Sequence, residues 1–146
     1  MLRGRVRIPG TRAARLPDET RVAAVPEGDE PAARASLALA DLVGRTVAIN
    51  RVTGTTAASL WPAASRLEIS WVATTEDWLV RIASGGAVGV TPAATSQLHR
   101  LPGVAYVPLA DAPPVPVWLV WTDPPTHPAV PRLVALVQEV TGGPAG

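Results

Sequence analysis

Three short loops carry the side chains that could do chemistry in this chain. Residues 50–56, "NRVTGTT", combine the single asparagine of the chain with an arginine and three threonines. Residues 74–77 hold two threonines and two acids, and a third threonine loop stands at residues 91–92. Hydroxyl, amide and guanidinium groups are the donors and acceptors that bind a small polar or anionic molecule. The three loops are therefore the candidate site.

Each of these loops directly follows a short apolar run that is typical of a strand. The runs are residues 46–49, 67–72 and 87–90, and the second and third loops also open predicted helices. Carboxyl ends of neighbouring parallel strands meet at one edge of a sheet, and free N–H groups at helix starts favour an anion. We expect one pocket at this edge, with Trp61 as a wall if it is not in the core. Its predicted lining is Asn50, Arg51, Thr53, Thr55, Trp61, Thr74, Thr91 and Pro92.

A structural role is the alternative for each loop taken alone. Threonine between a strand and a helix is a common N-cap, and Gly54 can serve a turn that needs a positive φ. Glu76 and Asp77 are neighbours at a helix start, where they stabilise the helix dipole. The binding hypothesis depends on all three loops converging.

The elements that would position these loops alternate between strands and short helices. Residues 74–86, "TTEDWLVRIASGG", carry the clearest helix pattern, with Thr74 as N-cap, Asp77 completing a capping box and two glycines as the stop. Residues 20–25 predict a strand, and residues 36–44 a short helix with Ser36 as its cap. The last helix is predicted to begin near Pro131. The order predicts an α/β fold with a largely parallel sheet.

Composition excludes several classes of function. A chain of 146 residues with 47% hydrophobic residues suits one compact domain, and a net charge of +1 gives no general attraction to nucleic acid or an anionic membrane. The five arginines among the first nineteen residues fit a solvated strand ("RVRI") or a frayed tail. Cysteine is absent, and His99 and His127 lack ligand spacing, so no metal or other cofactor is predicted. Without a signal peptide or a long apolar run, we expect a cytoplasmic protein.

Four segments resemble the effector-binding domain of LysR-type transcriptional regulators, in particular actinobacterial members. They are "TRVAAVPEGDEPAARASLALADLVGRTVAI", "DWLVRIASGGAVGVTPAATSQL", "GVAYVPLADAPPVPVWLVW" and "HPAVPRLVALVQEV", and the match runs from about Arg3 to Val140. The resemblance implies one lobe of a type II periplasmic-binding-protein-like fold, in which two lobes clamp a small organic effector. It also implies that Asn50, Arg51, Thr53 and Thr55 face the ligand, with Thr74, Thr91 and Pro92 beside them.

The sequence also departs from this family. Most of the first lobe and the DNA-binding helix-turn-helix have no counterpart here, and Asp29 stands where the family has a histidine. Residues 1–19 are predicted as an N-terminal crossover, 20–110 as the effector-binding lobe, and 111–146 as the return strand and C-terminal helix. The chain is either a fragment or a natural stand-alone protein, and the starting Met and the final "GGPAG" slightly favour the second. No direct contact with nucleic acid or a membrane is expected.

Two functions fit these observations. One is a stand-alone small-molecule-binding domain whose organic ligand can be anionic. The other is a cofactor-independent cyclase or isomerase of a secondary-metabolite pathway that uses the same pocket. An enzyme needs a titratable group in the pocket, and the nearby candidates are Glu76, Asp77 and Arg51. The two acids are better explained as caps, so binding is favoured. The apolar stripe of Leu133, Leu136, Val137 and Val140 needs a cover. The C-terminal segment can fold back onto its own domain or pair with the same segment of a second chain, and we favour the second, a homodimer.

Overall fold

The chain folds into two units, each with its own sheet. The computed structural model describes residues 1–4 and 7–142. Unit 1 consists of Met1–Glu19 and the chain from Val115 onward, and unit 2 of Thr20–Pro114. The first predicted segment and the last one from Val115 onward therefore belong to the same unit, whereas residues 111–114 belong to unit 2. Part of the predicted "RVRI" strand, residues 5–6, lies outside the described residues.

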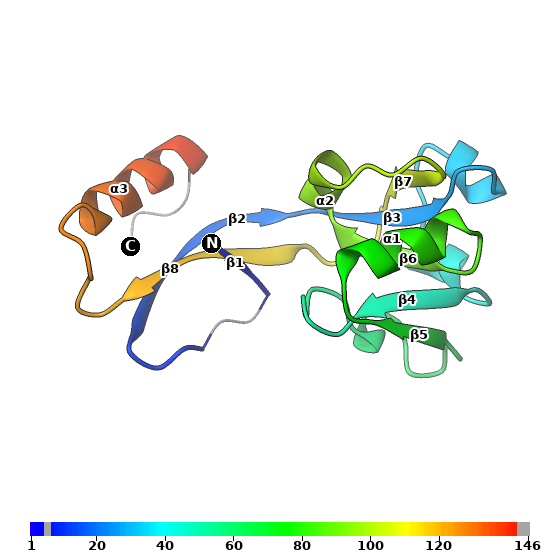
Figure 1. The fold of residues 1–146 in the computed structure, drawn as a ribbon, viewed down its shortest axis with the longest axis horizontal. Helices are drawn as coiled ribbons and strands as arrows, with labels where there is room; N and C mark the ends of the chain where they lie inside the picture. The colour runs from blue at the N-terminus through cyan, green and yellow to red at the C-terminus, as the bar shows by residue number, and fades with distance from the viewer. Residues whose placement is uncertain (5–6, 143–146) are drawn as a thin grey trace. The chain divides into compact units, whose positions relative to one another are not determined.

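Unit 2 is built on a five-stranded mixed sheet in the order β5-β4-β6-β3-β7 (Figure 1). The strand β4 is parallel to both β5 and β6, whereas β3 is antiparallel to β6 and β7. The three predicted core strands thus share one sheet, as expected, but parallel pairing is confined to them. The strands are β3 Arg21–Pro26, β4 Thr46–Asn50, β5 Glu68–Val72, β6 Val88–Pro92 and β7 Val104–Pro108.

Helix α1, Thr75–Ala83, covers one face of this sheet (Figure 1). Its side chains Trp78, Leu79 and Ile82 are buried against small residues of the strands, Ala24 and Ala48 among them. The spacing of these three residues in the sequence predicts that they lie on one face of a helix, and the structure agrees. The indole nitrogen of Trp78 donates a 2.9 Å hydrogen bond to the carbonyl of Ala48, which ties the helix to β4.

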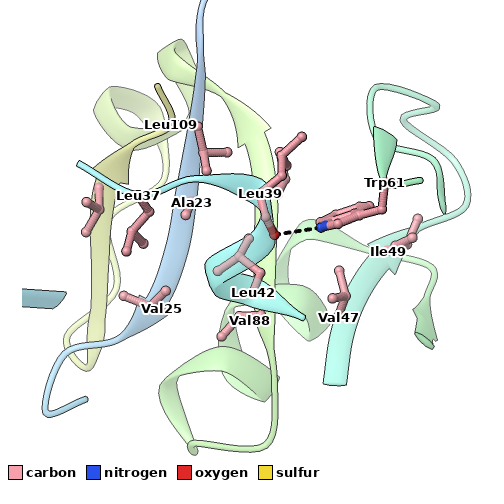
Figure 2. Packing of buried hydrophobic residues seen from close by; sticks show 12 residues of the cluster. Ala23, Val25, Leu37, Leu39, Leu42, Val47, Ile49, Trp61, Val88 and Leu109 are labelled. Atoms are coloured by element: carbon pink, nitrogen blue, oxygen red, sulfur yellow. Dashed lines mark hydrogen bonds between the residues drawn. The ribbon is translucent and has the colours of Figure 1, made fainter. Parts of the chain in front are cut away.

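The opposite face of the sheet is covered by irregular segments and Trp61 (Figure 2). The predicted helix over residues 36–44 is wrong, because only a 3-10 turn, η2 Leu39–Leu42, forms there. Leu37 instead bridges Leu109 in strand-like fashion, and the buried leucines lie two and three residues apart, which does not fit one face of a helix. Two further 3-10 turns, η1 Glu30–Ala33 and η3 Ala58–Leu60, and a short helix, α2 Ala93–Leu98, complete unit 2.

Unit 1 contains a three-stranded antiparallel sheet in the order β1-β8-β2. Its strands are β1 Leu2–Arg3, β2 Thr11–Glu19 and β8 Val115–Thr122, and helix α3, Val130–Thr141, contacts β2. As predicted, α3 begins beside Pro131. The arginines of β2 are paired with acids, Arg12 with Asp123 and Arg15 with Asp18. This pairing agrees with a solvated strand.

Thr74 caps α1 as the sequence predicts, and removing this cap should be measurable. Its hydroxyl accepts a 3.0 Å hydrogen bond from the Asp77 N–H. Thr74→Ala should lower the free energy of unfolding by about 1 kcal/mol, because that N–H then has only water as a partner. Thr75→Ala removes the same atoms one residue later without removing a cap. In urea titrations, equal losses for the two variants would contradict the capping role.

Candidate functional site

The candidate site lies at one edge of the unit 2 sheet, which we call the carboxyl edge. It is formed by the carboxyl ends of the three parallel strands β4, β5 and β6. Because β3 is antiparallel to β6, with Arg21 opposite Pro92, the start of β3 lies at the same edge. The parallel pairing thus brings the ends of all three predicted strands, and with them the loops that follow, to one edge.

The first loop is a turn built around Asn50. Its side-chain oxygen accepts hydrogen bonds from the N–H groups of Val52, at 2.9 Å, and Thr53, at 3.4 Å. Gly54 has a φ of +62°, so the sequence-based expectation of a positive φ at this glycine is correct. Thr53 itself is exposed, while Thr55 is half-buried. The turn and the candidate site therefore use the same residues.

Arg51 projects from this turn at the surface. Its guanidinium carbon lies 5.1 Å from the ring centroid of Trp71, which is 49% exposed. A cation over an aromatic face is weakly stabilised and loses some of its freedom of motion. The backbone N–H of Arg51 donates a 3.0 Å hydrogen bond to the carbonyl of Val72, which fixes its main chain. The side chain of Arg51 is a surface group that remains accessible to a ligand.

The other two loops have firm internal roles. Thr74 is exposed and caps α1. Thr91 is buried, and its hydroxyl bonds to that of Thr95 at 2.7 Å, while the adjacent Pro92 is buried at the start of α2. Thr56, the last residue of the first loop, is also buried and donates to the carbonyl of Val90. The polar groups of the edge are held in defined positions.

Strand alternation separates the predicted residues between the two faces of the sheet. Asn50 follows Ala48 by two residues and Thr91 follows Gly89 by two, so both lie on the face covered by α1. Trp61 belongs to the core on the other face, where it is 3% exposed and donates its indole N–H to the carbonyl of Leu39 at 2.9 Å (Figure 2). Because its ring is enclosed in this core, we leave Trp61 out of the proposed site.

Arg21 is a residue at this edge that the sequence analysis missed. It is 8% exposed and is the only buried charged residue among those described. Nε donates to the carbonyl of Pro113 at 2.7 Å, and Nη1 donates to that of Thr55 at 2.6 Å. Burial lowers the pKa of Arg21. The sequence contains a signal for this residue, because Arg21 is the first residue of a strand that is otherwise wholly apolar, "RVAAVP".

The edge offers hydrogen-bond donors and one buried positive charge. Within the described ranges, no cluster of three or more histidine, cysteine or acidic side chains could hold a metal ion. The same residues include no helix long and apolar enough to cross a membrane. The acids next to Thr74, Glu76 and Asp77, are exposed. The arrangement suits binding of a polar or anionic group.

Comparison with solved structures finds proteins of similar fold. No protein-family model and no curated protein sequence matches the chain. The structure resembles the full-length BenM E226K mutant, with a TM-score of 0.74 and 19% identity over 99% of this chain and 53% of that chain. It also resembles the BenM effector-binding domain with its effector benzoate, with a TM-score of 0.73 and 19% identity over 94% of this chain and 67% of that chain.

A third similar structure is full-length CbnR complexed with its target DNA. Here the TM-score is 0.76, with 20% identity over 95% of this chain and 52% of that chain. CbnR is described as a LysR family transcriptional regulator. This chain thus spans about half the length of these full-length proteins. Its α/β fold, with one mixed and one antiparallel sheet and few flanking helices, is that of the effector-binding domains of LysR-type regulators, which are type II periplasmic-binding-protein-like.

Proposed function

We propose that this chain is a small-molecule-binding domain related to LysR-type regulators, and that its ligand binds at the carboxyl edge of the unit 2 sheet. The observation that carries the proposal is the meeting of three polar loops and Arg21 at this edge. The BenM domain of the same fold was solved with benzoate as its effector, which supports a small organic ligand. The proposed contacts are Asn50, Arg51, Thr53, Thr55, Thr74, Thr91 and Pro92, with Arg21 added.

The second candidate function is a cofactor-independent cyclase or isomerase acting at the same edge. General acid–base chemistry would need a carboxylate or histidine held close to the substrate. The buried polar and charged side chains of the described residues are Arg21, Thr56 and Thr91, and none of them is such a group. Binding is therefore the function that the geometry supports better.

The test is a binding screen on the full chain, in which substitution of Arg51 shows whether a ligand binds at the carboxyl edge. Small aromatic and aliphatic carboxylates, starting with benzoate, are titrated against the ¹⁵N-labelled protein. We expect saturable shifts in the backbone amide signals of residues 50–56, 74–77 and Thr91. Arg51→Ala should weaken a carboxylate ligand roughly fivefold, because it removes one solvent-exposed charged contact.

Arg66→Ala provides the matched control for this screen. Arg66 is also exposed, but it precedes β5 and so lies at the amino end of that strand. Its removal should leave the affinity unchanged. A ligand whose shifts cluster away from the carboxyl edge, or a panel in which nothing binds, would contradict the proposed function.

We also propose that the chain forms a homodimer through α3. No residue of this helix is buried, and Leu133, Leu136 and Val140 are 54%, 53% and 77% exposed. Light scattering should give a mass near twice 15.2 kDa, and Leu133→Glu with Leu136→Glu should shift it to that of one chain. Arg132→Glu, at an exposed residue of the same helix, is the control and should leave the mass unchanged. A concentration-independent mass of one chain for the unmodified protein would rule the dimer out.

A further inference from the structure

Arg21 presents an unusual combination of burial and charge at the carboxyl edge. Its side chain is enclosed by its own strand, the loop carrying Thr55 and the loop carrying Pro113, with two main-chain carbonyls as hydrogen-bond partners. Among the described residues, no acid lies within ion-pair distance of its guanidinium. Buried charges are normally paired, since an isolated one is costly to take out of water.

One end of the guanidinium is left for another partner. Nε and Nη1 are bound to carbonyls, whereas Nη2 has no hydrogen bond to the described residues. In the same residues, no fully buried side-chain nitrogen lacks a partner. Nη2 must therefore reach solvent, although Arg21 as a whole is 8% exposed. Access to the side chain is therefore narrow, and Nη2 is the nitrogen without a protein partner among the described residues.

A purely structural role explains only part of this arrangement. Linking two loop carbonyls requires N–H donors, and a neutral amide such as glutamine supplies them without burying a charge. The desolvation that lowers the pKa of Arg21 is a cost that the two carbonyls repay in part. An anion at Nη2 would make use of the charge and offset that cost.

We propose that Arg21 is the binding site for the carboxylate of a small organic acid, held end-on at Nη2 by a guanidinium that two loop carbonyls keep in place. This inference rests on the proposed function, and it adds to it the chemical class of the ligand and the residue that selects it. Pre-positioning lowers the entropic cost of binding, because the arginine side chain is already ordered before the ligand arrives.

A carboxylate fits this site better than a phosphate. Around Nη2 the buried positive charge is that of Arg21 alone, and no second arginine bonds to the carbonyls of Thr55 or Pro113 within the described part of the chain. A phosphate dianion is usually met by several cations or by a run of loop N–H groups. The single positive charge of the guanidinium matches the single negative charge of a carboxylate.

The experiment follows the side-chain Nε–H signal of Arg21 in the ¹⁵N-labelled full chain. Benzoate, acetate, succinate, inorganic phosphate and the neutral analogue benzamide are titrated separately at constant ionic strength. At least one carboxylate should move this signal in a saturable way, and benzamide should not. If no carboxylate moves it, or if phosphate binds more tightly than every carboxylate, the assignment is wrong.

Variants then separate charge from structure. Arg21→Gln should weaken the carboxylate at least tenfold, and Arg21→Lys should weaken it less, since the charge remains. Arg66→Gln should have no effect. Should Arg21→Gln fail to fold, the wild-type titration still decides the question, because it needs no substitution.

The outcome also separates this inference from the proposed function. A ligand that shifts the three loops but binds equally well to wild type, Arg21→Lys and a folded Arg21→Gln would leave the domain a binding module and overturn the role of Arg21. A chain that binds no molecule of the panel at the carboxyl edge would overturn both.

Discussion

Replacing Gly89 with alanine is expected to lower the free energy of unfolding by about 2–3 kcal/mol. Gly89 lies in β6 directly beneath the Trp78 indole, and a Cβ at this position would come within 2.2 Å of Trp78 Cζ2. The indole has little room to move, because it is 5% exposed and its N–H is bound to the carbonyl of Ala48. The added methyl group must therefore displace either the helix or the strand. Urea denaturation of both proteins measures the loss.

Two further variants test that explanation. Gly28→Ala is the matched control, since nothing lies within 4 Å of its added Cβ and its φ is not positive. It should change stability by less than about 0.5 kcal/mol. In a Trp78→Leu background, Gly89→Ala should cost much less than in the wild type, because the clashing ring atoms are gone. An equal loss in both backgrounds would show that the clash is not the cause.

Removing the Trp61 side chain is expected to cost about 3–5 kcal/mol, the range for a buried aromatic residue. Trp61 fills the core between β4 and the irregular segment around Leu37, Leu39 and Leu42, and its indole donates to the carbonyl of Leu39 (Figure 2). Trp61→Ala should therefore release a segment that has few backbone hydrogen bonds of its own. Hydrogen exchange should show residues 37–42 losing protection before the sheet does.

A smaller substitution divides this loss into packing and hydrogen bonding. Trp61→Phe keeps most of the apolar volume but leaves the Leu39 carbonyl without its donor, so about 1–2 kcal/mol should be lost. Trp71→Ala, at a half-exposed tryptophan of the same unit, is the control and should cost less than Trp61→Ala. If Trp61→Phe proves as damaging as Trp61→Ala, the hydrogen bond matters more than the packing.

The regular elements of unit 2 could be predicted from local patterns. Thr74, Asp77 and Gly85 determine where α1 begins and ends, and each acts on its immediate neighbours in the chain. The segment around Leu37 could not be predicted in this way. Its backbone forms hydrogen bonds with residues near Leu109, more than seventy positions away in the sequence. The local sequence pattern predicts a short helix, but this long-range bridge forms instead.

The candidate site was predictable to a similar extent. The common edge for the loops at Asn50, Thr74 and Thr91 followed from the order of strands. Arg21 did not, because its role depends on loop carbonyls from Thr55 and Pro113, which no local pattern connects to it. Trp61 is close to a candidate loop in the sequence, but this closeness did not determine on which face of the sheet its ring packs.

The division of the chain into units has a consequence for the order of folding. Unit 2 is one continuous segment of the chain. The strands β2 and β8 of unit 1 precede and follow that segment in the sequence, and they pair from Thr11↔Thr122 to Glu19↔Val115. During synthesis, β2 has no strand partner until β8 has left the ribosome, so unit 2 can complete its sheet first. Once β3 and β7 have paired, with Val22 opposite Pro108, the two ends of unit 2 are held close together. The long loop that β2 and β8 would otherwise have to close is then already short, which reduces its entropic cost.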